Sequence, residues 1–380
     1  MHYIKLVKLW YSIVIGTLIL TFGFNYIIDP YSQNNKFLFK FNKIKFINDD
    51  VSFKFIFTKN KEFNTYSFGS SRTSTIDPDL IEKNLVFSRA INASFGSASL
   101  DEIKKFIDST ILNTSDFKYV FIGLDFYQFS ENWIPTRPIS AQNLIGSNEN
   151  NMNYVQYINL KTVNDSIKTL IYNSRGQNFN EQSCNLECMS YKKKGMRYYS
   201  DFLNNGNYNT QKKVTDGKHY WHRESYDYSQ VLTLKNILNK LRENNVTVFI
   251  YFNPITFQQI YLGTSFFEQL NLIDDIVSNT DAKIYDFNNL NMVNLNNSYF
   301  LDPFHFNYKI ADCIVNKITL DKSECGHDFG EIIDKNNISA FKHRMKNKYF
   351  DLMDDENLWL TPEQISTAKK LAREWIRKNQ

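Results

Sequence analysis

"YSFGSSRTST", residues 66–75, joins a short apolar run to a polar turn. The run 65–68, which reads TYSF, has the aromatic and β-branched composition of a strand. Gly69 then permits a tight backbone turn, and Ser70, Ser71 and Arg72 follow it. The sequence therefore predicts a strand whose carboxyl end presents a pair of serines, at the edge where α/β sheets bind their ligands.

The same rhythm of short apolar runs and helix-period segments continues downstream. Ser99 and Glu102 form a capping box that opens a helix running to about Leu112. Further strands are expected at 86–92, 119–124, 246–252 and 282–287, with helices near 231–241, 267–277 and 308–318. Alternating apolar strands and helices predict an α/β domain over 61–320, built as a three-layer, doubly wound parallel sheet with helices on both faces.

Three segments fall outside this rhythm. Residues 29–60 are expected to be a connector that packs on the domain, and 130–225 an insertion with short elements of its own. The aromatic residues of the insertion either pack within it or form a sugar-stacking lid; they include Trp133, Tyr154, Tyr157 and Trp221. Residues 321–380 are charged and predict a helical appendage that ends in a helix at about 362–378.

The N-terminus contains twenty consecutive residues without a charge, 9–28. At about 1.5 Å per residue, a helix of that length spans a hydrocarbon core of about 30 Å. Lys5 and Lys8 precede the segment and Asp29 follows it, which predicts that residues 1–8 stay in the cytoplasm and the rest of the chain is exported. An uncleaved anchor is favoured, because the segment is longer than a usual signal-peptide core and no small-x-small cleavage site follows it. A cleaved signal peptide and a buried helix are the alternatives.

Charge and cysteine content bound the function classes. The net charge is only +4, and the basic residues do not gather on one predicted face, so we expect no nucleic-acid partner. Cys184 and Cys188 lie in a polar loop and could form a disulfide, whereas Cys313 is expected as a core thiol. A zinc site from Cys184, Cys188, Cys325 and His327 lacks the paired spacing of known zinc modules.

His219 and His222 are a rival metal site, three residues apart, with only Asp216 or Glu224 as a nearby carboxylate. A surface segment is the preferred interpretation. We therefore expect neither a metal nor an organic cofactor.

Polar residues that follow the predicted strands suggest acyl transfer. This chemistry needs a nucleophile, a base, an acid that orients the base, and donors for an oxyanion. Ser71 can be the nucleophile, His305 the base and Asp302 the orienting acid, since Asp302 lies three residues before His305. The backbone N–H groups of Ser71 and Gly96 can be the oxyanion donors.

These residues resemble the SGNH hydrolase superfamily over roughly 61–320. Gly69–Ser71 is similar to its first block, Gly96 to the second-block glycine, Gly123–Asp125 to the third block and Asp302–His305 to the DxxH of the last. The layout also resembles membrane-anchored envelope members, those of alginate O-acetylation and teichoic-acid D-alanylation. The resemblance implies a single-pass protein of the bacterial inner membrane, an exported acyltransferase or acylesterase domain, an envelope glycan as substrate and a membrane-bound O-acyltransferase as partner.

The sequence departs from the superfamily at two positions. Ser70 stands where an Asp is usual, and we expect its hydroxyl to serve the backbone of the turn. Asp125 stands where an Asn usually donates to the oxyanion, and an ionised carboxylate would repel that charge. Either Asp125 is protonated, or another donor such as Asn92 or Arg72 substitutes. Asp125 also favours a first rival, a non-catalytic member that binds glycan or scaffolds the acyltransferase. A second rival is a structural protein in which Ser71 and His305 never meet.

Overall fold

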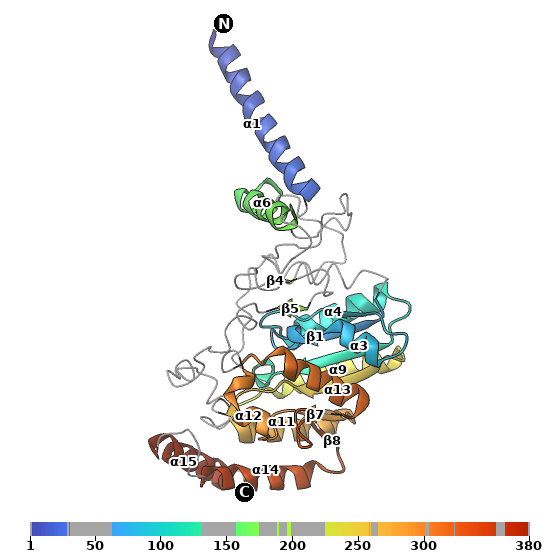
Figure 1. The fold of residues 1–380 in the computed structure, drawn as a ribbon, viewed down its shortest axis with the longest axis vertical. Helices are drawn as coiled ribbons and strands as arrows, with labels where there is room; N and C mark the ends of the chain where they lie inside the picture. The colour runs from blue at the N-terminus through green and yellow to red at the C-terminus, as the bar shows by residue number, and fades with distance from the viewer. Residues whose placement is uncertain are drawn as a thin grey trace.

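A computed structural model describes residues 2–28, 30, 63–130, 157–174, 188–189, 196–198, 225–257, 259, 265–300, 304–322, 324–354 and 362–378. An N-terminal helix, α1 (His2–Ile28), projects from an α/β body, and the C-terminus lies at the opposite end of the molecule (Figure 1). The connector 29–60 and most of the insertion 130–225 lie outside the described residues.

The body is built on a six-stranded sheet of order β2-β1-β3-β6-β7-β8. The first five strands in this order are parallel, and β8 is antiparallel to β7. The strands are β1 (Thr65–Gly69), β2 (Ala90–Asn92), β3 (Tyr119–Leu124), β6 (Thr247–Phe252), β7 (Ile284–Asp286) and β8 (Glu331–Ile333). The five expected strands are thus present, whereas the expectation of an entirely parallel sheet is wrong at the β8 edge.

The parallel strands follow the chain order 2-1-3-4-5, one of the two common orders of doubly wound sheets. In this order the connections turn to opposite sides of the sheet between β1 and β3. The register pairs Gly69 with Gly123, so the two strands end side by side. Loops that leave these two strand ends diverge, and the crevice between them is where such sheets bind ligands.

Apolar side chains cover both faces of the sheet because successive residues of a strand point to opposite sides. On β3, Val120 and Ile122 belong to one buried cluster and Phe121 to the other. The first cluster includes residues of α4 (Leu100–Asn113), α9 (Tyr228–Glu243) and α11 (Ser265–Thr280). The second includes residues of α3 (Pro78–Asn84) and α13 (Tyr308–Leu320). Helices therefore pack on both faces.

The shorter elements of the body are helices η1 (Thr73–Thr75), η2 (Phe126–Phe129), α12 (Met292–Leu295) and η6 (Asn297–Tyr299). The insertion contributes α6 (Leu160–Ser174) and the hairpin of β4 (Cys188–Met189) with β5 (Arg197–Tyr198). The predicted capping box of α4 is confirmed: the Glu102 N–H donates to Ser99 Oγ (3.2 Å), and the Ser99 N–H donates to Glu102 Oε2 (2.9 Å).

The C-terminal region differs from the expected helical appendage. Its first element, β8, joins the sheet, and α14 (Ile338–Met353) and α15 (Pro362–Lys378) add to the first apolar cluster. Tyr349 is buried with its ring stacked on Phe266 (5.2 Å), and the Trp375 ring stacks on Phe267 (5.0 Å). The many charged residues of this region predicted an appendage outside the core. The apolar side chains of α14 and α15 nevertheless pack into the core.

Cys313 also corrects an expectation. It forms a disulfide with Cys325 and is not a free core thiol. The bond ties α13 to the loop that leads into β8. It occupies the Cys325 sulfur, so Cys325 is not a thiolate ligand in the zinc site considered above. Cys184 lies outside the described residues, and so do His219 and His222.

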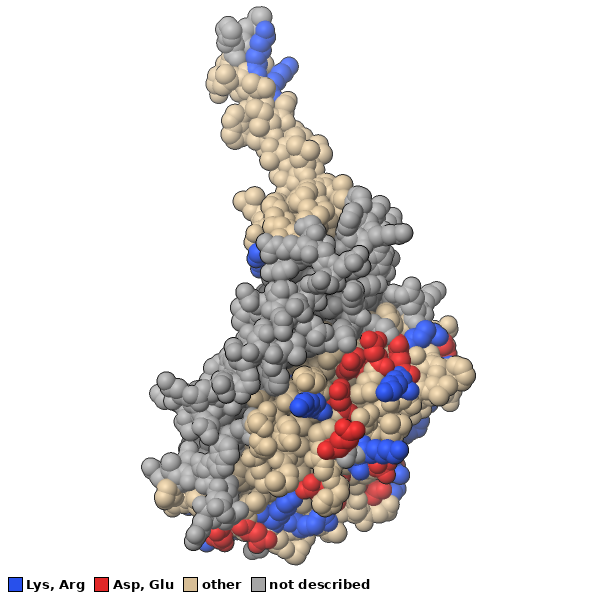
Figure 2. All heavy atoms as spheres, in the orientation of Figure 1, with Lys and Arg blue, Asp and Glu red and all other residues tan. Residues whose placement is uncertain are grey.

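Among the described residues, α1 alone is long and apolar enough to cross a membrane, with a mean hydropathy of 1.7 over Tyr3–Ile28. In Figure 2 its basic side chains gather at the N-terminal tip, where Lys5 and Lys8 lie, and the rest of its surface is uncharged. A helix of this kind is a single-pass anchor or a signal sequence. Tyr157 of the insertion is buried with its ring against Phe22 and Tyr26 of α1, so it is not part of a sugar-binding lid.

Candidate active site

The turn after β1 presents Ser71 on a backbone fixed by its neighbours. Ser70 Oγ accepts the Arg72 N–H (3.1 Å), so Ser70 serves the backbone of the turn, as expected. Ser74 Oγ donates to the Ser71 carbonyl (2.6 Å). Ser70 is buried and Ser71 is half-buried. The Ser71 hydroxyl takes part in neither of these bonds.

Two glycines make room for the turn. A Cβ on Gly69 would lie 2.3 Å from Thr73 Oγ1, and one on Gly123 would lie 2.0 Å from the same atom. Thr73 therefore sits over the paired strand ends, where only glycines fit. The Asn253 amide, at the end of β6, donates to Thr73 Oγ1 (3.1 Å). The turn that carries Ser71 is thus seated on β1, β3 and β6.

Ser71 and His305 meet. Ser71 Oγ lies 2.8 Å from His305 Nε2, across 234 residues of sequence. His305 is half-buried, and its neighbour Phe306 forms an isolated antiparallel bridge with Phe300. Asn307 caps the start of α13 by accepting the Ile310 N–H (3.1 Å). A hydroxyl at this distance can pass its proton to a neutral imidazole nitrogen. Asp302, the predicted orienting acid, lies outside the described residues.

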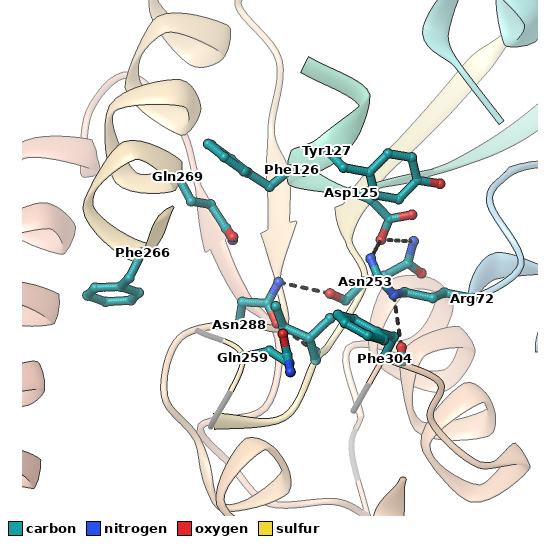
Figure 3. A pocket seen from close by; sticks show the side chains of 11 residues that line it. Arg72, Asp125, Phe126, Tyr127, Asn253, Gln259, Phe266, Gln269, Asn288 and Phe304 are labelled. Atoms are coloured by element: carbon teal, nitrogen blue, oxygen red, sulfur yellow. Dashed lines mark hydrogen bonds and ion pairs between the residues drawn. The ribbon is translucent and has the colours of Figure 1, made fainter. Parts of the chain in front are cut away.

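Arg72 and Asp125 form a buried ion pair beside this contact (Figure 3). Asp125 Oδ1 also accepts the Asn253 amide (3.3 Å), whereas Oδ2 has no hydrogen-bond partner among the described residues. The Asp125 side chain is fully buried. The carboxylate is therefore directed to the Arg72 guanidinium, which compensates a buried negative charge.

Arg72 links three segments. Its Nε donates to the Phe304 carbonyl (2.8 Å), one residue before His305, while its other nitrogen pairs with Asp125. The guanidinium also lies 5.4 Å from the Phe304 ring centroid and 5.8 Å from that of Tyr127. The fork of donors that characterises arginine is what allows this geometry. Arg72 thereby holds the segment of His305 against the turn that carries Ser71.

Asn92, proposed above as a substitute oxyanion donor, has a different role. Its amide nitrogen donates to the carbonyls of Thr73 and Ile76 (both 2.9 Å), and its oxygen accepts the Ser94 N–H (3.0 Å). Both amide hydrogens are thus used to hold the segment after Ser71, and Asn92 is fully buried. It cannot also donate to a substrate.

Gly96, the other predicted oxyanion donor, follows a residue that is bonded to the end of β1. The Phe95 N–H donates to the Gly69 carbonyl (3.1 Å), so the chain passes the end of β1 immediately before Gly96. A Cβ on Gly96 would meet no atom within 4 Å, which means that the space in front of it is open. The backbone at Gly96 therefore borders open space near the turn of Ser71.

A pocket of about 50 Å³ adjoins the ion pair, enough for a few water molecules or a small group of a ligand (Figure 3). It is lined by aromatic rings and side-chain amides around Arg72 and Asp125: Phe126, Tyr127, Asn253, Ile255, Gln259, Phe266, Gln269, Asn288 and Phe304. Gln259 and Gln269 are 5% and 6% exposed, and no described residue hydrogen-bonds to their amides. The Asn288 amide, in contrast, donates to the Asn253 carbonyl (2.8 Å).

One group behind the pocket titrates unusually. Burial, together with the nearby charge of Glu331, raises the pKa of Asp286 to about 7. Its Oδ1 accepts the Asn288 N–H (3.0 Å), which opposes the rise without cancelling it. Asp286 ends β7, and Asn288, whose N–H it accepts, is one of the residues that line the pocket.

Sequence reasoning missed Asn253 and the pocket amides. Asn253 directly follows the apolar run 246–252, so the rule that found Asp125, a polar residue at the carboxyl end of a strand, also applied to it. Gln259 and Gln269 follow no such rule. Gln269 lies within α11, where a glutamine is usually a solvent-facing residue.

The sequence matches no known protein-family model and no curated protein sequence. The assignment of this site therefore depends on its geometry.

Proposed function

We propose that the protein is a membrane-anchored, exported serine acyltransferase or acylesterase, similar to the SGNH hydrolases, which acts on an envelope glycan. The observation that carries the proposal is the 2.8 Å contact between Ser71 Oγ and His305 Nε2. It lies at the carboxyl ends of the parallel strands, beside the crevice between β1 and β3, where doubly wound sheets bind their ligands.

In the proposed reaction, Ser71 Oγ attacks the acyl carbonyl and His305 Nε2 takes the hydroxyl proton. Asp302 is proposed to hold the other imidazole nitrogen. Backbone N–H groups at Ser71 and Gly96 stabilise the oxyanion. The leaving group then receives the proton from His305. The acyl–serine ester is finally cleaved by a sugar hydroxyl, which gives transfer, or by water, which gives hydrolysis, with His305 as the base again.

The Arg72–Asp125 pair takes the place of the usual third-block amide. Arg72 is adjacent to the nucleophile in sequence, and its positively charged guanidinium bonds to Asp125 and to the Phe304 carbonyl, one residue before His305. Asp125 compensates most of that charge and aligns the guanidinium. The Arg72–Asp125 pair therefore positions the segments of Ser71 and His305, and backbone N–H groups are the principal oxyanion donors.

The pocket favours an uncharged, hydroxyl-rich ligand. Among the described residues that line it, the one cation is Arg72, which is already paired with Asp125, so these residues offer an anionic ligand no unpaired positive charge. Gln259 and Gln269 offer amide donors and acceptors, and the rings of Phe126, Phe266 and Phe304 offer apolar surface. Amides with aromatic rings match the hydroxyls and C–H faces of a sugar.

The test is turnover of an activated acetate ester by the full-length protein, with and without an oligosaccharide acceptor. We expect Ser71→Ala and His305→Ala to abolish turnover, and the matched control His343→Ala, an exposed histidine on α14, to keep it. Acetylated oligosaccharide would identify a transferase, and free acetate alone an esterase. Turnover that persists in Ser71→Ala would refute the proposal.

A second candidate is a non-catalytic protein that binds glycan in the same pocket or scaffolds a membrane-bound O-acyltransferase. The observation that favours it is the carboxylate of Asp125 where the superfamily resemblance calls for an amide donor. This candidate predicts glycan binding that is equal in wild type and Ser71→Ala, without ester turnover in either protein.

The cellular setting is part of the proposal. The length and hydropathy of α1 and the lysines at its N-terminal tip support a single-pass anchor in the bacterial inner membrane, with the α/β domain exported. A membrane-bound O-acyltransferase is the proposed partner, since an exported acyl–serine intermediate needs an acyl donor at the membrane.

A further inference from the structure

Helix α6 buries polar side chains and exposes apolar ones. Its buried residues follow helical spacing on one side: Thr162, Asp165, Ser166 and Thr169. Its exposed large apolar residues lie on the other side, and Ile158 just precedes them: Leu160, Ile167, Leu170 and Ile171. Leu160 is 82% exposed. This is the reverse of a helix that packs on a water-soluble domain, where the apolar side faces inward.

Ser166, on the polar side of α6, and Tyr157, just before the helix, are bonded to α1. Asn25, the one amide in α1's apolar segment, is fully buried. Its Nδ2 donates to the Tyr157 carbonyl (2.7 Å), and its Oδ1 accepts the Ser166 hydroxyl (2.8 Å). Helix α6 thus satisfies the polar group that α1 would otherwise present to lipid, as polar groups in membrane helices require.

The depth of Asn25 places α6 at the membrane surface. Asn25 lies seventeen positions after Lys8, about 26 Å along a helix that rises about 1.5 Å per residue. With Lys8 at the cytoplasmic boundary of a hydrocarbon core of about 30 Å, Asn25 lies within about 5 Å of the opposite boundary. Figure 1 shows α6 lying across that end of α1.

We infer that α6 lies in the outer face of the bilayer, with its apolar side in the lipid acyl region, as a second membrane contact beside α1. The inference rests on the proposed anchor, because the apolar side of α6 is continuous with that of α1. Lys161 and Lys168 are exposed on one flank of α6, and Lys168 Nζ lies 4.0 Å from Asp165 Oδ1. The long side chain of Lys161 can reach anionic headgroups from this flank. No acidic side chain is visible on the described part of this end in Figure 2. Two contacts restrict how the chain tilts relative to the membrane, which a single helix does not.

The test uses the full-length wild-type protein in nanodiscs whose phosphatidylglycerol carries a diazirine on its acyl chain. After photolysis, labelled peptides are mapped by mass spectrometry. Peptides from α1 and from 157–174 should be labelled about ten-fold more than the α4 peptide 100–113, because only groups within the acyl region meet the probe. The α4 peptide is a suitable control since Leu112 is apolar and 73% exposed.

Matched variants sharpen the result. Ile167→Gln should lower the labelling of 157–174 several-fold, and Leu112→Gln, which changes an exposed apolar residue of α4, should leave it unchanged. Labelling of α1 without labelling of 157–174 overturns the inference and leaves the anchor standing. Labelling of neither overturns both, whatever the outcome of the ester assay. A photocrosslinking experiment in native membranes gives a further check. If residues 157–174 crosslink to an integral membrane protein and not to lipid, the lipid contact is refuted in favour of a protein contact.

Discussion

Replacing Arg72 by Gln should weaken both the fold and the candidate site, because Arg72 joins the turn of Ser71 to β3 and to the segment of His305. The change removes the ion pair with Asp125 and the bond from Nε to the Phe304 carbonyl. Arg72→Lys should not restore both contacts, since a lysine presents a single point charge in place of a fork of donors.

The magnitude follows from burial. The Asp125 side chain is fully buried and that of Arg72 is 11% exposed. Removing one partner of a buried pair costs about 3–5 kcal/mol, because an uncompensated charge remains. The matched control is Arg89→Gln, which breaks the exposed Arg89–Asp116 pair (52% and 47% exposed) and should cost at most about 1 kcal/mol.

The assay is guanidinium chloride unfolding of the full-length protein in detergent, followed by near-ultraviolet circular dichroism. Asp125→Asn completes a double-mutant cycle. The double variant should be about 2–3 kcal/mol more stable than the sum of the single losses predicts, because both charges leave together. Additive losses, or an Arg72→Gln variant as stable as Arg89→Gln, would refute the reasoning.

Three further predictions concern the framework of the site. Asp286→Asn should flatten the pH dependence of the unfolding free energy. Because the pKa of Asp286 is raised to about 7, the wild type loses up to about 4 kcal/mol of stability as pH rises from about 4 to 7. Unfolding of the wild type and the variant at a series of pH values measures the difference. Gly123→Ala should cost about 1–3 kcal/mol of unfolding free energy because its Cβ would lie 2.0 Å from Thr73 Oγ1, whereas Gly96→Ala, with open space around it, should cost at most about 0.5 kcal/mol; equal losses would contradict the packing account. Cys325→Ser should lower stability by about 3 kcal/mol under oxidising conditions, the closure entropy of a loop of this length, and should have no effect in reductant; a loss that persists in reductant would argue against the disulfide as its cause.

Much of the sheet could be predicted from the sequence because apolar runs and turn chemistry are local signals. The run 119–124 is entirely apolar and is indeed the central strand β3, and the capping box marked the start of α4. The β8 edge could not be predicted, because a three-residue strand carries almost no pattern and its pairing with β7 depends on tertiary contact. The disulfide was missed for a similar reason. Cys313 has the spacing of a core residue, and its partner, Cys325, lies beyond the end of α13.

The candidate site was predicted as far as strand order allows. Ser71 and His305 were placed at one edge of the sheet by the rule for carboxyl ends of parallel strands, and the structure brings them together. The ion pair of Asp125 with Arg72 could not be predicted, because it depends on the direction of the Arg72 side chain in the folded turn. The role of Asn92 was missed for the same reason, since only the folded turn shows which carbonyls its amide meets.

The most direct measurement of the central claim is covalent labelling of the full-length protein by a fluorophosphonate, with the adduct located by peptide mass spectrometry. The contact between Ser71 and His305 predicts one adduct on Ser71, none on the neighbouring Ser70, loss of labelling in Ser71→Ala and much slower labelling in His305→Ala. An adduct that remains at full yield in Ser71→Ala, or no adduct on the wild-type protein, would contradict it.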